Sequence, residues 1–265
     1  MAGVLVTGGT GVLGSEIVPR LLTKGYDVRV LSRRAQPRVP AGARTVRGDL
    51  VTGAGINDAV AGVDVIVHCA SGTRTLRSLT YRSGRRTDVE ATRRMLDGAR
   101  RSGATPFVVY ISIVGIDRIP LGYYRAKLET EQVIEASGLP YSTLRTTQWH
   151  TFAWEIAKRL TAFPVVLAPK GLRLQLLDPG EVADRMVSLL EAGPAGMTPD
   201  MGGPETLDIV DVLRSYLRAK GKRRAVASVR FPGRAVAAFA AGHNLTPAYA
   251  DGRIAWEDWL AQHAS

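Results

Sequence analysis

Short apolar runs recur along the first 147 residues, and most of them end at a glycine or a polar residue. Runs such as VDVIVHCA and FVVYISI are almost continuously apolar, which is typical of strands buried on both faces of a sheet. The pattern predicts six strands, at residues 4–6, 28–31, 45–47, 63–70, 107–113 and 141–145.

Between these runs, apolar residues recur every three or four positions, as they do along one face of a helix. The pattern predicts helices at residues 14–24, 88–102 and 123–137, and each is followed by glycine, a common helix stop. Pro19 lies inside the first of them and argues against a straight helix there. The alternation of strands and helices predicts an α/β fold with a Rossmann-type, doubly wound parallel sheet covered by helices on both faces.

The pattern loosens beyond residue 147. Strands are expected at residues 165–168 and 172–177, a helix at 179–191, and a mixture of turns and helices from residue 197 onward. We therefore expect a core domain at residues 1–147 and small C-terminal elements at residues 148–265 that are interleaved with it.

The chain carries 35 Lys and Arg against 24 Asp and Glu, a formal net charge of +11. This excess indicates either an anionic partner or the arginine-rich composition of a GC-rich coding sequence. The arginines are spread along the whole sequence, which favours the second interpretation, and we expect no nucleic-acid partner.

Other classes of protein are not favoured by the sequence. Cys69 is the only cysteine, so no internal disulfide can form, and no cysteine or histidine cluster has the spacing of a metal site. No signal-peptide pattern and no membrane-spanning apolar run is present, so a cytoplasmic protein, monomeric or homodimeric, is expected.

The stretch TGGTGVLG lies where the first strand gives way to the first helix. Gly9, Gly11 and Gly14 fit the G-x-G-x-x-G fingerprint of dinucleotide binding. The first glycines permit a tight turn, Gly11 lets a pyrophosphate approach the backbone, and Gly14 lets the helix lie close to the sheet. The helix N-terminus offers free N–H groups and a partial positive charge to the phosphates.

The second strand ends in Leu-Ser32-Arg33-Arg34, without the acidic residue that usually binds the ribose of NAD. Two guanidinium groups suit a 2′-phosphate, to which Ser32 can add a hydrogen bond, and this favours NADP (NADPH) over NAD. Asp49 follows the third strand, where it either accepts from the adenine amino group or caps a local turn.

Ser112 stands at the end of the fifth predicted strand, and Tyr123 and Lys127 lie four residues apart on one face of a predicted helix. A nearby ammonium favours the phenolate and lowers the pKa of a tyrosine, which can then protonate a carbonyl oxygen. Ser112 can donate a hydrogen bond to the same oxygen. Tyr124 is three residues from Lys127 and competes with Tyr123 for that face.

The sequence resembles the atypical short-chain dehydrogenase/reductase superfamily, and in particular its NmrA-like NAD(P)-binding group, which includes proteins labelled as epimerase/dehydratase-like. The segments that carry this resemblance are TGGTGVLG, YISIVGID, YYRAK, GLPYSTLR, LLDPGEVAD and WEDWL. The resemblance implies catalytic roles for Ser112, Tyr123 and Lys127, and it implies that Arg33 selects NADP. Together with the glycine loop, it leads us to expect cofactor contacts from Thr7, Gly8, Gly9, Thr10, Gly11, Val12, Leu13, Gly14, Ser32, Arg33, Arg34, Asp49, Leu50, Cys69, Ala70, Ser71 and Lys127.

Gln148, Trp149, His150 and Phe152 follow the sixth predicted strand, where folds of this kind line the substrate pocket. They suit a small apolar or aromatic substrate, although Trp149 and Phe152 fit ordinary packing as well, and a lone histidine is more often structural than catalytic. The basic stretch at residues 74–86 is expected to be a solvated loop or a flap near the cofactor phosphates.

These features predict an NADPH-dependent oxidoreductase that transfers hydride to a carbonyl, quinone or enone of a small organic molecule. Two alternatives remain. One is a regulator that senses NADP(H) without catalysis, and the other is an isomerase resembling nucleotide-sugar epimerases.

Overall fold

The computed structural model describes residues 1–72 and 80–263. The chain divides into two compact units. The first unit contains Met1–Ser112, Leu121–Leu144 and Val182–Thr198, so one segment beyond residue 147 belongs to it. The second unit contains Ile113–Pro120, Arg145–Glu181 and Pro199–Ser265.

The main sheet has seven strands in the order β3-β2-β1-β4-β5-β6-β9. Registered neighbours such as β1 and β2, β1 and β4, and β4 and β5 run parallel, which confirms the predicted Rossmann-type sheet. All six predicted strands are present, and the short β9 extends the sheet beyond β6. The strands are β1 (Gly3–Thr7), β2 (Asp27–Ser32), β3 (Arg44–Arg47), β4 (Val65–His68), β5 (Phe107–Ile113), β6 (Tyr141–Thr146) and β9 (Gly196–Met197).

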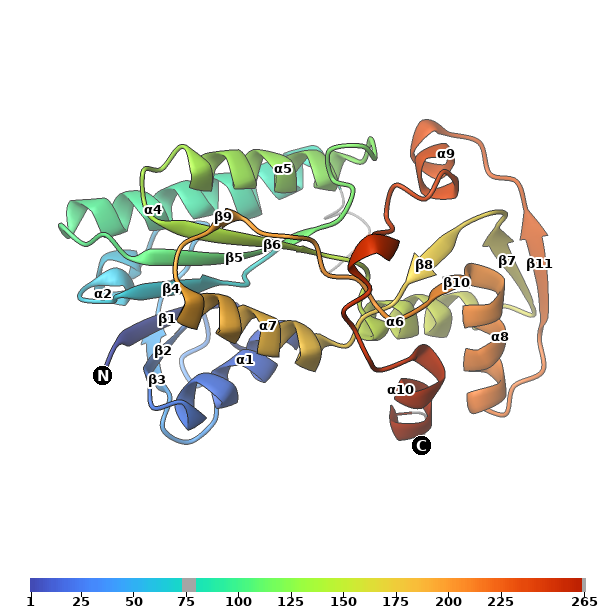
Figure 1. Cartoon of the computed structure of the whole chain (residues 1–265), viewed down its shortest axis with the longest axis horizontal. Coiled ribbons are helices and arrows are strands. Elements are labelled where there is room, and N and C mark those ends of the chain that lie inside the picture. The colour runs from blue at the N-terminus through green and yellow to red at the C-terminus, as the bar shows by residue number, and fades with distance from the viewer. Residues whose placement is uncertain (73–79, 264–265) are drawn as a thin grey trace. The chain divides into compact units, whose positions relative to one another are not determined.

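Helices cover both faces of this sheet. In Figure 1, α4 and α5 lie over one face, and α1 and α7 lie over the other. The apolar faces of α2 and α4 pack with sheet residues such as Leu5 and Ile66, both fully buried, into one hydrophobic core. The helices of this region are α1 (Val12–Thr23), α2 (Ile56–Val60), α4 (Glu90–Arg101), α5 (Gly122–Glu135) and α7 (Pro179–Ala192).

The predicted first helix is present, and α1 continues through Pro19. A proline ring removes the N–H that would bond to the carbonyl four residues earlier, here that of Ser15. Both Pro19 and Ser15 are exposed, so water can bind the carbonyl that is left without its helical partner.

The loop expected at residues 74–86 is only partly tested, because residues 73–79 lie outside the described residues. In the part that the structure describes, the loop conformation expected at residues 81–86 is wrong. The chain forms a helical turn, α3 (Tyr81–Gly84), and then a π-helical turn, η2 (Arg85–Val89), which leads into α4. Gly84 allows this, since a Cβ there would lie 2.7 Å from the Cβ of Ala126 on α5.

The second unit is built around helices and two small sheets. Its strands pair as an antiparallel β8–β10 and a parallel β7–β11. Its core gathers aromatic side chains, among them Trp154, Tyr216, Trp256 and Trp259. The elements are α6 (His150–Leu160), β7 (Val165–Pro169), β8 (Arg173–Gln175), β10 (Thr206–Asp208), α8 (Ile209–Ala219), β11 (Ala225–Val229), α9 (Arg234–Ala240), the 3₁₀ turn η3 (Pro247–Tyr249) and α10 (Trp256–His263).

Candidate dinucleotide and catalytic site

The glycine loop joins β1 to α1 in a close approach of backbone to backbone. Gly8 has φ +71°, and a Cβ there would lie 2.8 Å from the backbone of Cys69 and Ala70, beyond the end of β4. A Cβ at Gly14, in the first turn of α1, would overlap the Gly8 carbonyl oxygen and the Gly9 Cα. Only glycine fits these two positions, and Gly14 is the third glycine of the predicted fingerprint.

The open side of this loop fits a dinucleotide pyrophosphate. Thr10, Gly11 and Val12 are exposed at the N-terminus of α1. Gly11 caps the helix without a side-chain hydrogen bond, so the first N–H groups of α1 point outward with no capping side chain over them. Backbone donors and the positive end of a helix form an anion site suited to phosphate.

The strand register brings the other predicted cofactor residues to the same edge of the sheet. Thr7 pairs with Leu31 of β2 on one side and with His68 of β4 on the other. Residues that follow these strands therefore flank the glycine loop. Such residues, at the carboxyl ends of parallel strands where the strand order reverses, form the ligand crevice of this architecture.

The end of β2 presents two cations beside the loop. Arg33 and Arg34 are exposed, and the hydroxyl oxygen of Ser32 accepts from the Arg34 N–H at 3.2 Å. Asp49, after β3, accepts from the Val51 N–H at 2.8 Å. This hydrogen bond is the local turn that was one of the two interpretations of Asp49.

Tyr123 and Lys127 share one face of α5, where their residues are 7% and 4% exposed. The Lys127 ammonium donates to the Ile111 carbonyl at 2.9 Å and lies 4.2 Å from the centroid of the Tyr110 ring. Ser112 follows Ile111 in β5 and is also buried. Its Oγ has no hydrogen-bond partner among the described residues.

The hydroxyl that the structure brings to Tyr123 is that of Ser71. A hydrogen bond of 2.8 Å joins Ser71 Oγ to the Tyr123 hydroxyl. Ser71 lies three residues beyond the end of β4 and is exposed. The sequence placed Ser71 among the cofactor contacts but gave no reason to pair it with the tyrosine, because 52 positions separate them.

Asp88, for which the sequence alone predicts no functional role, is a buried carboxylate at this site. It is 2% exposed on η2, and its Oδ1 accepts from the Gly72 N–H at 3.0 Å. Burial raises the pKa of Asp88, and the Lys127 ammonium, the Gly72 N–H and the Ser71 hydroxyl offset only part of that rise. In the sequence, Asp88 has the pattern of an ordinary acidic residue at a helix start.

Burial and neighbouring charges also act in opposite directions on the pKa of Lys127. Burial lowers the pKa of Lys127, and the negative charges of Asp88 and Glu131 oppose that shift. A lysine whose charged form is disfavoured is suited to exchange or share protons. Perturbed ionisable groups of opposite charge at a strand edge are typical of functional sites.

His68 and Thr7 hold the strands in place. The His68 ring is hydrogen-bonded to Thr7 Oγ1 at 2.6 Å and to Thr92 Oγ1 at 2.8 Å, and it stacks on Tyr110. Burial, together with the Lys127 charge, lowers the pKa of His68 to about 3, so the ring is neutral near pH 7. Burial raises the pKa of Cys69 to about 12, which makes its thiol unreactive.

Comparison with known proteins agrees with this geometry. A family model described as NAD(P)H-binding matches residues 8–161, more than half of the chain. The chain belongs to this NAD(P)H-binding family. The family accounts for the glycine loop, and it confirms the predicted relationship to NAD(P)-binding reductases and epimerases.

Three proteins illustrate the range of similarity of this NAD(P)H-binding chain. The 3-beta-hydroxysteroid dehydrogenase of Mycolicibacterium neoaurum is 35% identical over 112 residues, which are 40% of this chain and 30% of that protein. The NADPH-dependent quinone oxidoreductase QOR2 of Escherichia coli, complexed with NADPH, has a TM-score of 0.76 at 18% identity over 98% of this chain and 99% of that one. The UDP-glucose 4-epimerase of Thermus thermophilus, complexed with NAD, has a TM-score of 0.74 at 20% identity over 99% and 97%.

At these identities the two solved structures establish the fold of the NAD(P)H-binding chain. The chain spans about a third of the length of the first sequence relatives it matches. The matched family and the coenzymes bound in these structures show a nicotinamide dinucleotide as the cofactor class.

The four predicted substrate residues of the NAD(P)H-binding chain lie in the second unit and differ in exposure. Phe152 is 47% exposed and Gln148 is partly exposed. The Trp149 indole N–H donates to Thr146 Oγ1 at 3.1 Å. His150 is completely buried, with ring centroids 5.8 Å from Trp256 and 5.6 Å from Trp259, an arrangement that matches the structural alternative.

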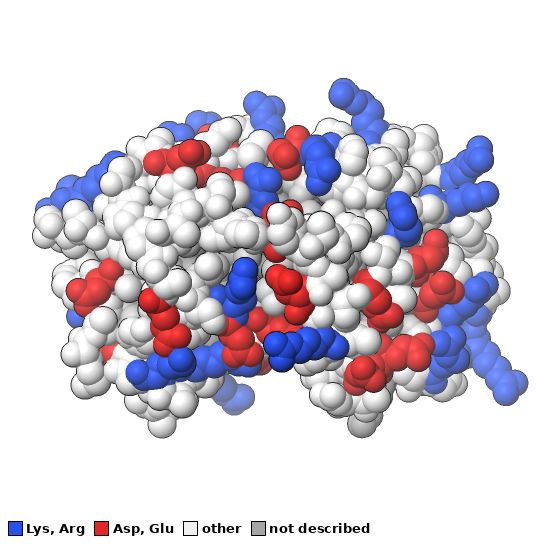
Figure 2. Space-filling model, viewed as in Figure 1, with Lys and Arg blue, Asp and Glu red and all other residues white. Residues whose placement is uncertain are grey.

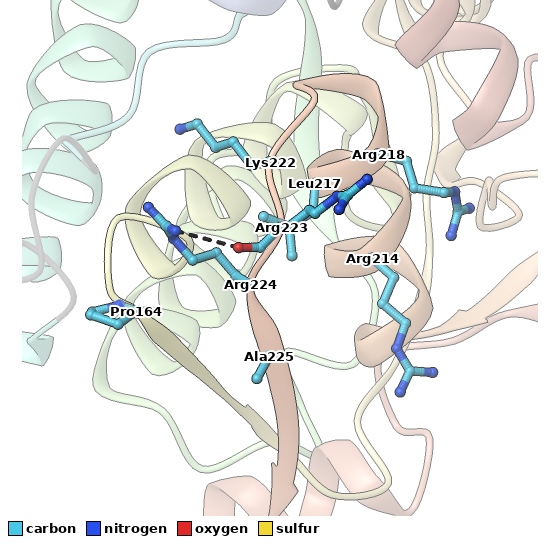
Figure 3. Close-up of a pocket in the computed structure, with 8 residues that line it drawn as sticks. All are labelled: Pro164, Arg214, Leu217, Arg218, Lys222, Arg223, Arg224 and Ala225. Atoms are coloured by element: carbon cyan, nitrogen blue, oxygen red, sulfur yellow. Dashed lines mark hydrogen bonds between the residues drawn. The ribbon is translucent and has the colours of Figure 1, made fainter.

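The second unit also has a basic groove of about 550 Å³ between α8 and β11 (Figure 3). In Figure 3, Arg214 and Arg218 point away from Lys222 and Arg224. Arg218 pairs with Glu257 at 2.9 Å. The positive charges do not converge on one point, and we assign no ligand to this groove.

Charge on the described surface is mixed. On the face in Figure 2, acidic and basic side chains are interspersed. Some of these charges form salt bridges near the surface, such as Arg44–Asp27 and Lys24–Glu191. Among residues 1–72 and 80–263, no helix is both long and apolar enough to cross a bilayer, and no three His, Cys, Asp or Glu side chains form a cluster able to hold a metal ion.

The substitution Gly14→Ala should weaken NADPH binding by about tenfold or more, because the new Cβ pushes α1 away from the Gly8 carbonyl. Isothermal titration calorimetry measures the affinity, and circular dichroism checks the fold. Ser15→Ala, at the neighbouring exposed position, is the matched control and should bind as the wild type does. Equal affinity in the two variants would contradict the proposed role of Gly14.

Asp88→Asn should change how stability depends on pH. Since burial raises the pKa of Asp88 in the folded protein, its ionisation lowers the free energy of unfolding as the pH rises from about 3.8 through that raised value. The variant lacks this loss, so its stability relative to the wild type should increase across the same window and then level off. Urea unfolding at a series of pH values measures the difference, and Asp58→Asn, at an exposed position, should show no such increase.

Proposed function

We propose that this protein is an NADPH-dependent reductase of the short-chain class, which acts on a carbonyl, quinone or enone of a small apolar or aromatic molecule. One observation carries the proposal. A tyrosine and a buried lysine share one face of α5, and the lysine donates to the carbonyl of Ile111 at the crevice end of β5.

The chain offers a group for each part of the dinucleotide. The N–H groups of the glycine loop and of the first turn of α1 would bind the pyrophosphate. Arg33 and Arg34 are exposed and suited to a 2′-phosphate, with Ser32 beside them. When bound, NADPH supplies the hydride.

Tyr123 would donate the proton that completes the reduction. Its hydroxyl hydrogen passes to the substrate oxygen as negative charge develops there. Lys127 would stabilise the resulting phenolate electrostatically, since an opposite charge favours the ionised form. Ser112 would donate a hydrogen bond to the same substrate oxygen from the end of β5.

The second unit supports an apolar substrate. Phe152 is 47% exposed, and Gln148 and Trp149 lie within the four residues that precede it in the sequence. Two of the similar proteins are named for a quinone and a hydroxysteroid, both of them ring molecules of low polarity. We therefore propose quinones, ketones and enones as the first compounds to test.

Tyr123→Phe should keep NADPH affinity and lower turnover by about a hundredfold or more, because it removes only the proton donor. Tyr124→Phe is the matched control, since both tyrosine residues are 7% exposed on α5. NADPH oxidation with each compound reports turnover, and calorimetry reports affinity. Equal turnover in the two variants would remove Tyr123 from the mechanism.

The same assays separate the alternative functions. Tight NADPH binding without turnover of any compound would indicate a regulator that senses the coenzyme. Coenzyme that stays bound through purification, together with conversion of nucleotide sugars, would indicate an isomerase.

Arg33→Ala should weaken NADPH binding by about tenfold or more and leave NADH binding nearly unchanged, because the guanidinium would contact only the 2′-phosphate. The control is Arg38→Ala, an exposed arginine further along the same connection. Calorimetric titration with both coenzymes measures the selectivity. Equal losses for NADPH and NADH would contradict this role of Arg33.

A further inference from the structure

The candidate site contains two serines whose surroundings differ. Ser112 is 1% exposed, and its Oγ makes no hydrogen bond with the described residues. Ser71 is exposed, and its Oγ lies 2.8 Å from the Tyr123 hydroxyl. Ser71 is thus in direct contact with the atom that would give up the proton, and it also reaches solvent.

Proton transfer through buried groups requires a path to water. Tyr123 and Lys127 are both buried, and the Lys127 ammonium is turned toward the Ile111 carbonyl. The exposed Ser71 hydroxyl can both donate and accept, as a relay between water and the phenol requires. Its distance from the Tyr123 oxygen is that of a well-formed O–H···O hydrogen bond.

Asp88 binds the backbone directly after Ser71. Its Oδ1 accepts from the N–H of Gly72, the residue directly after Ser71. The carboxylate is almost completely buried, and its Oδ2 has no hydrogen-bond partner among the described residues. It belongs to the π-helical turn η2, which packs against α5, and such turns often occur at functional sites.

We propose that Ser71 is a catalytic residue that returns a proton to Tyr123 from solvent, and that Asp88 is the positioning residue that fixes Ser71 against the tyrosine. This role rests on the proposed reductase function. It differs from the cofactor contact that the sequence predicts for Ser71.

The proton balance of this path closes. The Tyr123 O–H bond breaks as a new O–H bond forms on the substrate oxygen. The phenolate then takes the hydrogen of the Ser71 hydroxyl, while the Ser71 oxygen takes one from water. The protein ends as it began, and the substrate has gained one proton derived from solvent.

Ser71→Ala should lower kcat by about tenfold or more and leave the calorimetric affinity for NADPH unchanged. Ser71→Thr keeps a hydroxyl and should retain most of the turnover. Without coenzyme, ultraviolet titration of tyrosinate should show that Ser71→Ala raises the pKa of Tyr123, because the phenolate loses a hydrogen-bond donor. Subtracting the titration of the same variant carrying Tyr123→Phe isolates this tyrosine among the eight.

Two substitutions at Asp88 test whether this residue positions Ser71. Asp88→Ala and Asp88→Asn both remove the buried negative charge, so a comparison of the two isolates the hydrogen bond to the Gly72 N–H. Asp88→Ala loses the acceptor and should lower kcat, as Ser71→Ala does. Asp88→Asn retains an acceptor oxygen and should restore most of the turnover, with a Tyr123 pKa below that in Asp88→Ala. Equal effects of Asp88→Ala and Asp88→Asn would overturn the positioning role.

Measuring Tyr123→Phe in the same assays as Ser71→Ala separates the relay proposal from the reductase proposal. If it loses turnover while Ser71→Ala keeps the wild-type kcat and an unchanged Tyr123 titration, the relay is overturned and the reductase proposal stands. If Ser71→Ala changes only NADPH affinity, Ser71 is a cofactor contact and the relay is again overturned. If Tyr123→Phe itself retains turnover, the reductase mechanism falls and the relay falls with it.

Discussion

The approach of α1 to the end of β1 is the constraint on which the nucleotide site depends. Helix α1 can begin where it does only because Gly14 has no side chain to meet the Gly8 carbonyl. Gly8, at φ +71°, turns the chain beneath the backbone that follows β4. These contacts fix the first N–H groups of α1 at the edge of the sheet where the carboxyl ends of β1, β2 and β4 lie side by side. The same geometry sets both phosphate binding and the packing of the helix on the sheet.

Behind that edge the protein buries ionisable groups that a purely structural core would avoid. Lys127, Asp88 and Glu131 are all nearly inaccessible, and burial opposes the charged forms of Lys127 and Asp88. Such burial costs free energy and is tolerated where opposite charges and hydrogen bonds compensate. Here the opposite charges of Lys127 and Asp88 compensate each other, and two backbone groups, the Ile111 carbonyl and the Gly72 N–H, add hydrogen bonds. Lys127 and Asp88 are thus held as a pair of opposite charges inside the first unit.

The second unit is held together by an aromatic core. His150 is packed among the indoles of Trp256 and Trp259, which are themselves stacked, and its Nδ1 lies 4.0 Å from Asp178 Oδ2. This aromatic core joins α6 to α10, two helices separated by about a hundred residues of sequence. The exposed Phe152 lies on α6, the helix that this aromatic core anchors.

The sequence by itself determined six of the seven strands of the sheet, its long helices, the glycine loop and the cofactor class. All of these follow from local periodicity and from glycines that a nearby backbone requires. It also marked Tyr123 and Lys127, because their spacing along one helix is local. Only the tertiary structure decided that Ser71 is the hydroxyl on Tyr123, that Asp88 is buried beside Lys127, and that residues 81–89 are helical. These depend on which strand lies next to which and on burial against α5, and pairings between positions so far apart leave no periodic signal in one sequence.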